Sequence, residues 1–298
     1  MDLQQSTQVT NFYNWINERH SIYVQRTEHP LDPPWTKDVI LQSYKFTNVF
    51  RELDRTTKWM RKNWTNPNEN KSYSEIIFNC CLFRMIGTIE FAEDHGWVSN
   101  HEWDPDYTIN VIEDRLTENR RCFTGAYIIT NQGLKAKKSQ VVVNHFLKPV
   151  WKDRNKLAEC AETNSLQELH KKFAEYKGWG GGGFMAYEVV TDLNHTPVLE
   201  KATDRYTWAN AGPGAIRGLN RLLGRKLNKS ISQKQANKEM HYLMNQKNTY
   251  CLKHVPLSEV DMRAIEHSLC EWDKYERVRL NQGRPRSKFN AINAKPLL

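Results

Sequence analysis

Apolar residues recur at helical spacing along most of the chain, and few stretches alternate in the manner of a strand. The clearest example runs from Asp38 to about Asn63 and is predicted to be one helix, capped by Thr36 or Asp38. Its apolar stripe consists of Phe46, Phe50, Leu53 and Met60. A second, polar stripe consists of Tyr44, Asn48, Arg51 and Arg55. Because this second stripe lacks Lys and Glu, we expect it to line a cleft; the alternative is a solvated helix face.

The same spacing predicts further helices, so the chain is expected to be mainly α with few or no strands. A largely buried helix is predicted from Tyr73 to His95, and others near 109–118, 140–152 and 165–176. Residues 121–134 fit either a helix start or a short strand, and residues 228–247 have weak core potential. The last clear helix is predicted to open at Pro256, with Ser258 and Asp261 as an approximate capping box. Its inner stripe consists of Met262, Ile265, Leu269 and Trp272.

Proline and glycine divide this helical pattern. Pro30, Pro33 and Pro34 predict an N-terminal arm or cap over residues 1–36, followed by one helical catalytic and DNA-binding domain over 37–298. The glycine run at 178–183 lacks the Gly-Lys-Ser/Thr ending of a phosphate loop. It is interpreted as a hinge or as a place where backbone approaches a ligand closely.

The stretch from Trp208 to Gly224 joins a Gly-Pro-Gly turn to an arginine-faced helix. Gly212, Pro213 and Gly214 are expected to form a tight hairpin outside any helix, with the helix resuming at about Ile216. A hairpin of this kind offers backbone N–H groups and a positive helix start to a phosphate. That is the logic of a helix-hairpin-helix DNA clamp, while an ordinary connection with a solvated basic face is the alternative. The arginines at four-residue spacing are Arg217, Arg221 and Arg225.

Charge is spread unevenly over the 298 residues. The formal net charge is +9, and residues 214–298 hold 17 Lys and Arg against 7 Asp and Glu. The basic part from about residue 214 therefore favours a polyanionic partner. The chain has no apolar run of membrane-spanning length and no signal-peptide layout at its N-terminus, which predicts a cytoplasmic protein without a membrane partner.

Six cysteines are present, and none forms a Cys-x-x-Cys pair. We expect reduced structural thiols and no zinc or iron–sulfur site. The histidines are scattered, with no two at metal-ligand spacing, so no metal is predicted.

Two carboxylates on one predicted helix face suggest chemistry. Glu188 and Asp192 lie four apart, with Tyr187 beside them, and are able to supply general-base chemistry. Salt-bridge partners for the many arginines are the equal alternative. Arg84, in an apolar setting, needs a carboxylate or phosphate partner, and Asp54 or Glu90 would serve structurally.

Five segments together carry a resemblance that covers about residues 37–290. They are KFTNVFRELDR (45–55), FTGAYIIT (123–130), GFMAYEVVTDL (183–193), TWANAGPGAIRGLNRL (207–222) and IEHSLCEWDKYERVR (265–279). In these segments the chain resembles the alpha-glutamyl/putrescinyl thymine pyrophosphorylase family, the amino acid:DNA transferases of bacteriophages that make hypermodified thymine. The resemblance implies a fold similar to helix-hairpin-helix DNA glycosylases. It also implies displacement of the (pyro)phosphate of 5-(pyro)phosphomethyluracil in duplex DNA by the amine of an amino acid, on a flipped-out base.

The resemblance also suggests roles for individual residues. The residues expected to bind the leaving phosphate or the substrate carboxylate are Asn48, Arg51, Arg55 and Arg84. The residues expected to recognise the nucleobase and to activate the amine are Tyr187, Glu188 and Asp192, with Asp192 favoured as the general base. The pocket is completed or supported by Glu266, Glu271, Asp273 and Lys274. DNA contacts fall to Trp208, Gly212, Pro213, Gly214, Arg217, Arg221, Arg284 and Arg286.

The expected partners are double-stranded DNA and a free amino acid, with glycine as the working choice. No cofactor is predicted, and a divalent metal is left open. The arginines and acids are expected to share one cavity beside the hairpin. A glycosylase is disfavoured because the first carboxylate after Gly214 is Glu239, and a kinase because the phosphate loop is missing. A non-catalytic DNA-binding module is the third alternative.

Overall fold

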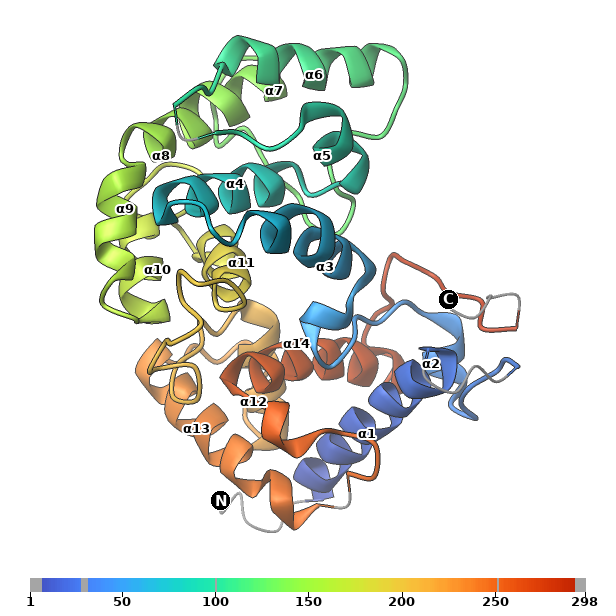
Figure 1. The fold of residues 1–298 in the computed structure, drawn as a ribbon. Helices are drawn as coiled ribbons and strands as arrows, with labels where there is room; N and C mark the ends of the chain where they lie inside the picture. Colours follow the sequence, from blue (N-terminus) through green and yellow to red (C-terminus); the bar gives the residue numbers. More distant parts are fainter. Residues whose placement is uncertain (1–6, 28–31, 100, 251, 293–298) are drawn as a thin grey trace. The chain divides into compact units, whose positions relative to one another are not determined.

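The computed structural model describes residues 7–27, 32–99, 101–250 and 252–292. Within them the chain is mainly helical, as predicted (Figure 1). The described residues contain one isolated antiparallel bridge, between Tyr44 and Lys288, and no longer strand pairing. The chain divides into two compact units, which are described separately. Unit 1 comprises Met1–Asp54 and Arg205–Leu298, and unit 2 comprises Arg55–Asp204. This division differs from the predicted arm followed by a single domain.

Unit 1 is built on two long helices, α1 and α14. Its helices are α1 (Thr7–Thr27), α2 (Val39–Ser43), α12 (Pro213–Leu222), α13 (Gln233–Gln246) and α14 (Met262–Arg279). Short 3₁₀ turns span Arg51–Leu53, Lys247–Thr249 and Leu257–Glu259. The predicted inner stripe of α14 is confirmed, because Met262, Ile265, Leu269 and Trp272 are fully buried.

The N-terminal segment is not an arm, because it contains the 21-residue helix α1. Phe12 and Ile16 on its inner side are buried in unit 1. Pro33 and Pro34 lie beyond the end of α1 at Thr27, so they do not interrupt the helix. Pro30 lies outside the described residues, as do residues 1–6 and Cys251 of the cysteine prediction.

The single helix predicted from Asp38 to Asn63 is also wrong. Asp38 does cap α2, accepting hydrogen bonds from the backbone N–H groups of Ile40 and Leu41. The helix ends at Ser43, however, and Tyr44 is extended, with φ −129° and ψ 148°. Backbone bonds to the C-terminal segment and the bond from the Asn48 N–H to Asp54 compete with helix formation here. The predicted polar stripe therefore does not lie on one helix.

Close packing of α12 on α14 explains two glycines of the Gly-Pro-Gly segment and its helix. A Cβ on Gly214 would lie 2.2 Å from Cys270 Sγ, and one on Gly218 would lie 2.6 Å from the Leu269 carbonyl oxygen. Pro213 and Gly214 are inside α12, contrary to the prediction, because proline is tolerated at the first helical position. Turns at 201–207 and a stretch without helix at 208–212 precede α12. Of the two helices expected on either side of the hairpin, only the second, α12, is therefore present.

Two other boundaries in unit 1 differ from the predictions. Asp261, not Ser258, caps α14 through the Ala264 N–H. The stretch 228–247 holds the amphipathic helix α13, whose Met240 and Leu243 are fully buried. Its single acidic residue, Glu239, pairs with Arg225 through both oxygens at 2.7 Å.

Unit 2 is arranged around α4, in which every residue from Ser74 to Ile86 is buried. Its helices are α3 (Arg55–Met60), α4 (Tyr73–Ile86), α5 (Ile89–His95), α6 (Pro105–Thr117), α7 (Lys138–Gln140), α8 (Lys148–Lys152), α9 (Arg154–Ala161), α10 (Leu166–Ala174) and α11 (Phe184–Leu193). π-Helical turns span Arg61–Thr65 and Val141–Leu147, and a 3₁₀ turn spans Asn66–Asn68. The predicted helix 73–95 is interrupted at Gly87, whose φ of 75° ends α4. Residues 121–134 form neither helix nor strand.

The glycine run before α11 serves packing at two of its positions. A Cβ on Gly178 would lie 2.4 Å from the Phe146 ring, and one on Gly180 would lie 2.6 Å from the Ala174 carbonyl oxygen. The close approach expected from the sequence is therefore made by the chain itself at these two positions, while Gly183 precedes α11 with φ 68°.

Candidate functional site

A group of basic side chains surrounds His267 on one face of α14. This cation cluster consists of Arg19, Arg51, Arg263 and Lys274. Arg263, His267, Glu271 and Lys274 are spaced by three or four residues and so share a helix face. Thr47 ties the neighbouring loop to this face, because its hydroxyl contacts His267 Nε2 and its N–H donates to Glu271 Oε2 at 2.9 Å.

Arg19 enters the cluster from α1 and is held there by neutral acceptors. It donates to the carbonyl oxygens of Thr47 at 2.9 Å and Phe46 at 3.2 Å, and to Asn48 Oδ1 at 2.8 Å. Its side chain is buried, and burial lowers the pKa of Arg19 to about 10. Arg19 therefore remains a cation at neutral pH without a directly bonded carboxylate.

Two carboxylates face the cluster. Asp54 lies 3.1 Å from Arg51 Nη1 and accepts from both Asn48 nitrogens, and Glu271 lies 2.6 Å from Lys274 Nζ. Burial raises the pKa of Asp54, although Arg51 and the Asn48 N–H oppose that shift. Burial and the four surrounding cations lower the pKa of His267 well below its usual value, so its ring is neutral. Arg51 and Lys274 are thus each paired with a carboxylate, whereas Arg19 is held by neutral oxygens.

The start of α12, predicted to bind phosphate, is occupied by a carboxylate of the same unit. The Gly212 N–H donates to Glu266 Oε1 at 3.1 Å. Arg217 Nε and Arg221 Nε both donate to the fully buried Asp273, at 2.9 and 2.7 Å. Arg221 is only 6% exposed, whereas Arg217 is 37% exposed. Of the predicted DNA contacts on α12, Arg217 is thus the more accessible arginine.

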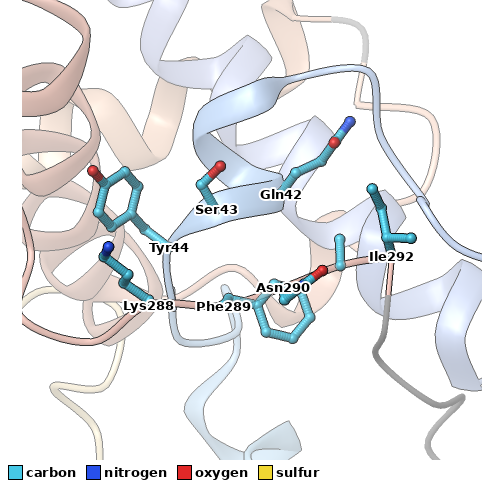
Figure 2. A pocket seen from close by; sticks show the side chains of 8 residues that line it. Gln42, Ser43, Tyr44, Lys288, Phe289, Asn290 and Ile292 are labelled. Carbon is cyan, nitrogen blue, oxygen red and sulfur yellow. The ribbon is translucent and has the colours of Figure 1, made fainter.

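The C-terminal basic residues lie on a fixed segment beside α2. The N–H groups of Lys45, Phe289 and Ala291 donate to Ser287, Ser43 and Gln42, respectively, and tie residues 287–291 to residues 42–45. Figure 2 shows the pocket of about 550 Å³ that these two stretches line. Arg284 and Arg286 are exposed just before it, while Trp208 is half-buried. Their DNA contacts remain predictions.

In unit 2, Arg84 forms a buried ion cluster with two predicted catalytic residues. Arg84 Nη2 donates to Asp192 Oδ1 at 2.6 Å, Arg84 Nε donates to Asp192 Oδ2, and Glu188 lies 3.9 Å from Nη1. Arg84 also donates to the Thr57 hydroxyl at 3.1 Å. Arg84, Glu188 and Asp192 are each at most 6% exposed. The carboxylates expected to pair with Arg84, Asp54 and Glu90, are therefore not its partners.

The predicted residues thus fall into separate groups. Asn48, Arg51, Glu271 and Lys274 come together in unit 1, and Glu266 and Asp273 lie on the same helix facing α12. Arg84, Tyr187, Glu188 and Asp192 belong to unit 2, as does Arg55 at the start of α3. A shared cavity beside the Gly-Pro-Gly turn remains a prediction.

Sequence reasoning missed Arg19, Asp54, Arg263 and His267 as members of the site. Arg263 and His267 carried a usable signal, because they precede Glu271 and Lys274 at helical spacing. Arg19 carried none, since it lay in the presumed arm. In the described part of the chain, no group of three or more His, Cys, Asp or Glu side chains is arranged to hold a metal ion. Nor does any described helix have the length and apolarity to cross a membrane.

Comparison with known proteins gives one family and one phage relative. The family model for "5-hmdU DNA kinase, helical domain" matches residues 6–284. A 5-hmdU DNA kinase of Bacillus phage SP10 is 27% identical over 293 residues. The alignment covers 89% of this chain and 44% of the relative, so the chain spans less than half of that protein's length. No solved structure matches the chain.

Proposed function

We propose, because the chain belongs to the family of 5-hmdU DNA kinase helical domains, that it acts on duplex DNA containing a phosphorylated derivative of 5-hydroxymethyluracil. The proposed reaction replaces the phosphate or pyrophosphate with the amine of an amino acid, giving a hypermodified thymine. The observation that carries the proposal is the cation cluster, in which four basic side chains surround His267 and Arg19 is held by neutral oxygens alone. We place the reaction in the cytoplasm of a phage-infected bacterium.

A cluster of four basic side chains suits a phosphate leaving group. A phosphate monoester carries between one and two negative charges at neutral pH and accepts several charge-assisted hydrogen bonds. Fixed cations that face a departing phosphate stabilise the charge that develops in the transition state. Arg51 and Lys274 are 15% and 20% exposed, so they are accessible to such a ligand. Arg19, in the same cluster, is buried.

The proposed step is a substitution at the 5-methylene carbon of the base. The amine nitrogen forms a bond to that carbon, and the carbon–oxygen bond breaks with its electron pair leaving on the (pyro)phosphate. One proton must leave the attacking ammonium. We place its acceptor at Asp54, because this carboxylate lies beside Arg51 in the cluster and burial raises its pKa. Asp192 is less suited, because its side chain is only 4% exposed, whereas that of Asp54 is 21% exposed.

A second candidate function follows from the relative's length. The phage SP10 protein is named a kinase and is more than twice as long as the aligned region. The 298 residues of this chain contain no phosphate-loop motif for ATP. The shared helical domain is therefore a candidate for the part that recognises hydroxymethylated DNA and presents the base to chemistry performed elsewhere.

Product analysis separates these functions. Purified protein is incubated with duplexes that contain 5-hydroxymethyluracil, 5-phosphomethyluracil or 5-pyrophosphomethyluracil, together with a mixture of amino acids. The DNA is then digested and its nucleosides are resolved by mass spectrometry. We expect an amino-acid adduct only from the phosphorylated duplexes. Abasic sites would indicate a glycosylase, and unchanged but bound DNA would favour the recognition module.

The base assignment has its own variant pair. Asp54→Asn is expected to lower the single-turnover rate by about 10²–10⁴-fold, the usual contribution of a general base. The matched control is Asp94→Asn, a carboxylate of unit 2 paired with Arg115 and 37% exposed. An unchanged rate in Asp54→Asn would transfer the role to another group, and loss of rate in Asp192→Asn alone would identify that group.

A further inference from the structure

The pocket between residues 42–44 and 288–292 of unit 1 is lined by no acidic side chain. Its volume of about 550 Å³ lies within the range of about 300–1,000 Å³ that is usual for sites of small ligands. Its polar side chains are those of Gln42, Ser43, Tyr44, Lys288 and Asn290. The pocket therefore offers positive charge and hydrogen-bonding groups, but no negative charge, to a ligand.

Tyr44 and Lys288 are neighbours in this pocket. They are opposite each other in the isolated antiparallel bridge, and residues in that relation have their side chains on the same face. Figure 2 shows the Tyr44 ring and the Lys288 side chain next to each other at one end of the lining. Lys288 is exposed and Tyr44 is partly exposed, and neither side chain has a hydrogen bond or an ion pair with another described residue. An aromatic ring and an ammonium are thus both accessible to a ligand.

The two segments that line the pocket are fixed to each other and to α1. The Phe289 N–H donates to the Ser43 carbonyl oxygen at 2.9 Å. The guanidinium carbon of Arg26, on α1, lies 5.4 Å from the centre of the Phe289 ring and 4.6 Å from the centre of the Trp35 ring. A lining that is already held in place lowers the conformational cost of binding a ligand.

Cations continue along the chain on either side of the pocket. They are Lys45, Arg284 and Arg286, each of which is exposed and has no ion pair with a described carboxylate. Residues 39–48 and 280–292 contain no Asp or Glu. Proteins commonly hold single-stranded DNA by cations that follow its phosphates and by aromatic rings on which its bases stack. The further cations therefore fit a strand with several phosphates better than a free nucleotide with one.

We propose that this pocket binds an unpaired nucleotide of a DNA strand, with the base stacked on the Tyr44 ring and the phosphate paired with Lys288. A base inside a duplex is stacked between its neighbours, so it offers no face to the Tyr44 ring. Stacking on an aromatic ring requires no particular base, because every base has a π-face. The inference goes beyond the proposed function, because it requires neither a phosphorylated hydroxymethyluracil nor turnover. Its failure and the failure of the proposed reaction are therefore measured independently.

The test is fluorescence anisotropy of the full chain with three unmodified DNA ligands built on one duplex. The first duplex is blunt, and the second carries a short single-stranded thymidine tail at each end. The third carries the same tails with abasic sites in place of the bases. We expect wild type to bind the thymidine-tailed duplex at least about fivefold more tightly than either of the others, the lower end of the range for stacking one base on an aromatic ring.

Variants of the two central residues separate stacking from phosphate binding. Tyr44→Leu, which removes the ring, is expected to reduce the preference for thymidine tails over abasic tails to less than about twofold, whereas Tyr44→Phe is expected to retain it. Lys288→Gln is expected to weaken binding of both tailed duplexes and to reduce the salt slope by about 0.7 for the lost phosphate contact. The control is Tyr107→Leu, on a side chain of α6 in unit 2 that is 46% exposed, which is expected to change nothing.

Circular dichroism checks that each variant is folded, and the comparison of the three duplexes with wild type decides if Tyr44→Leu is not. Equal affinity of wild type for the blunt and the thymidine-tailed duplexes overturns the proposal, as does a preference for thymidine tails that Tyr44→Leu retains. Equal affinity for thymidine and abasic tails overturns the stacking on Tyr44. Displacement of the tailed duplex by an equimolar amount of thymidine monophosphate overturns the assignment to a strand.

Discussion

Two arginine-centred clusters of this protein differ in what neutralises them. In unit 2, Arg84 is buried and is engaged by both oxygens of Asp192, with Glu188 beside it. In unit 1, Arg19 is also buried, but neutral carbonyl and amide oxygens hold it. Arg51, Arg263 and Lys274 belong to the same cluster. Arg84 is thus neutralised by a carboxylate that it contacts directly, whereas Arg19 is not.

From this difference we propose a structural role for the Arg84 cluster and a binding role for the cation cluster. A buried pair with full hydrogen bonding is costly to break but has no need of a ligand. A buried cation that is held by neutral oxygens is stabilised further by an anion from outside. Arg51 and Arg84 were predicted as parts of one site, because the family resemblance requires arginines for the leaving phosphate or the substrate carboxylate. The two clusters are distinguished by the hydrogen-bond partners that each arginine has in the folded chain.

The largest effect is expected when the Arg84 cluster is broken. Arg84→Met leaves Asp192 buried without its cation and should destabilise the protein by about 3–5 kcal/mol in urea unfolding. The double variant Arg84→Met/Asp192→Leu should recover most of that loss, since an apolar pair replaces the ion pair. The control Arg120→Met, on a side chain 44% exposed, should cost less than about 1 kcal/mol. A loss of unfolding free energy in Arg84→Met no larger than that in the control would show that the Arg84 cluster has no structural role.

A smaller loss is expected where α12 packs on the helix that carries the cation cluster. In Gly218→Ala the new Cβ meets the Leu269 carbonyl oxygen at 2.6 Å, so α12 must shift. The expected cost is about 1–3 kcal/mol, measured by thermal unfolding. Gly125→Ala is the control, because nothing lies within 4 Å of its Cβ. Equal melting temperatures for the two variants would mean that the α12–α14 contact adapts freely.

Acid should weaken unit 1 through its histidines. Burial and Arg19 lower the pKa of His20 to about 4, and the pKa of His267 is also lowered, so the folded chain binds fewer protons than the unfolded chain below about pH 6.5. Stability is therefore full above that pH and falls as the pH drops toward 4, by up to about 1.4 kcal/mol per pH unit for each such histidine. His20→Gln should flatten the profile of urea midpoints in this window, while His145→Gln, on an exposed side chain, should not. A profile that rises with acid would contradict the account.

The smallest effect concerns the exposed basic segment outside both clusters. Arg284→Gln/Arg286→Gln is expected to reduce the slope of log K against log salt for duplex DNA by about 0.9 for each phosphate that is no longer neutralised. Fluorescence anisotropy at several salt concentrations measures that slope. The same double substitution at Lys171 and Lys172, on α10 of unit 2, is the control. Unchanged slopes in both variants would mean that the DNA binds to another surface and does not contact Arg284 or Arg286.

The helical class and most buried faces were predictable, because apolar spacing alone determines them. The inner stripe of α14 and the buried run of α4 are examples. The break at Tyr44 was not predictable, since it depends on backbone bonds to residues more than 240 positions later in the chain. For the same reason the sequence did not indicate that Arg84 and Arg51 belong to different clusters. Which carboxylate approaches which arginine is decided by tertiary packing, and Arg84 pairs with a carboxylate 108 positions away.

The central claim is that the cation cluster holds the phosphate of the modified base. It is tested most directly by the affinity of the chain for two duplexes that differ at one position, 5-phosphomethyluracil or 5-hydroxymethyluracil. We predict that wild type prefers the phosphorylated duplex at least tenfold, about 1.4 kcal/mol, and that Arg51→Gln removes most of this preference while Arg120→Gln retains it. Equal affinity of the wild type for the two duplexes would contradict the account.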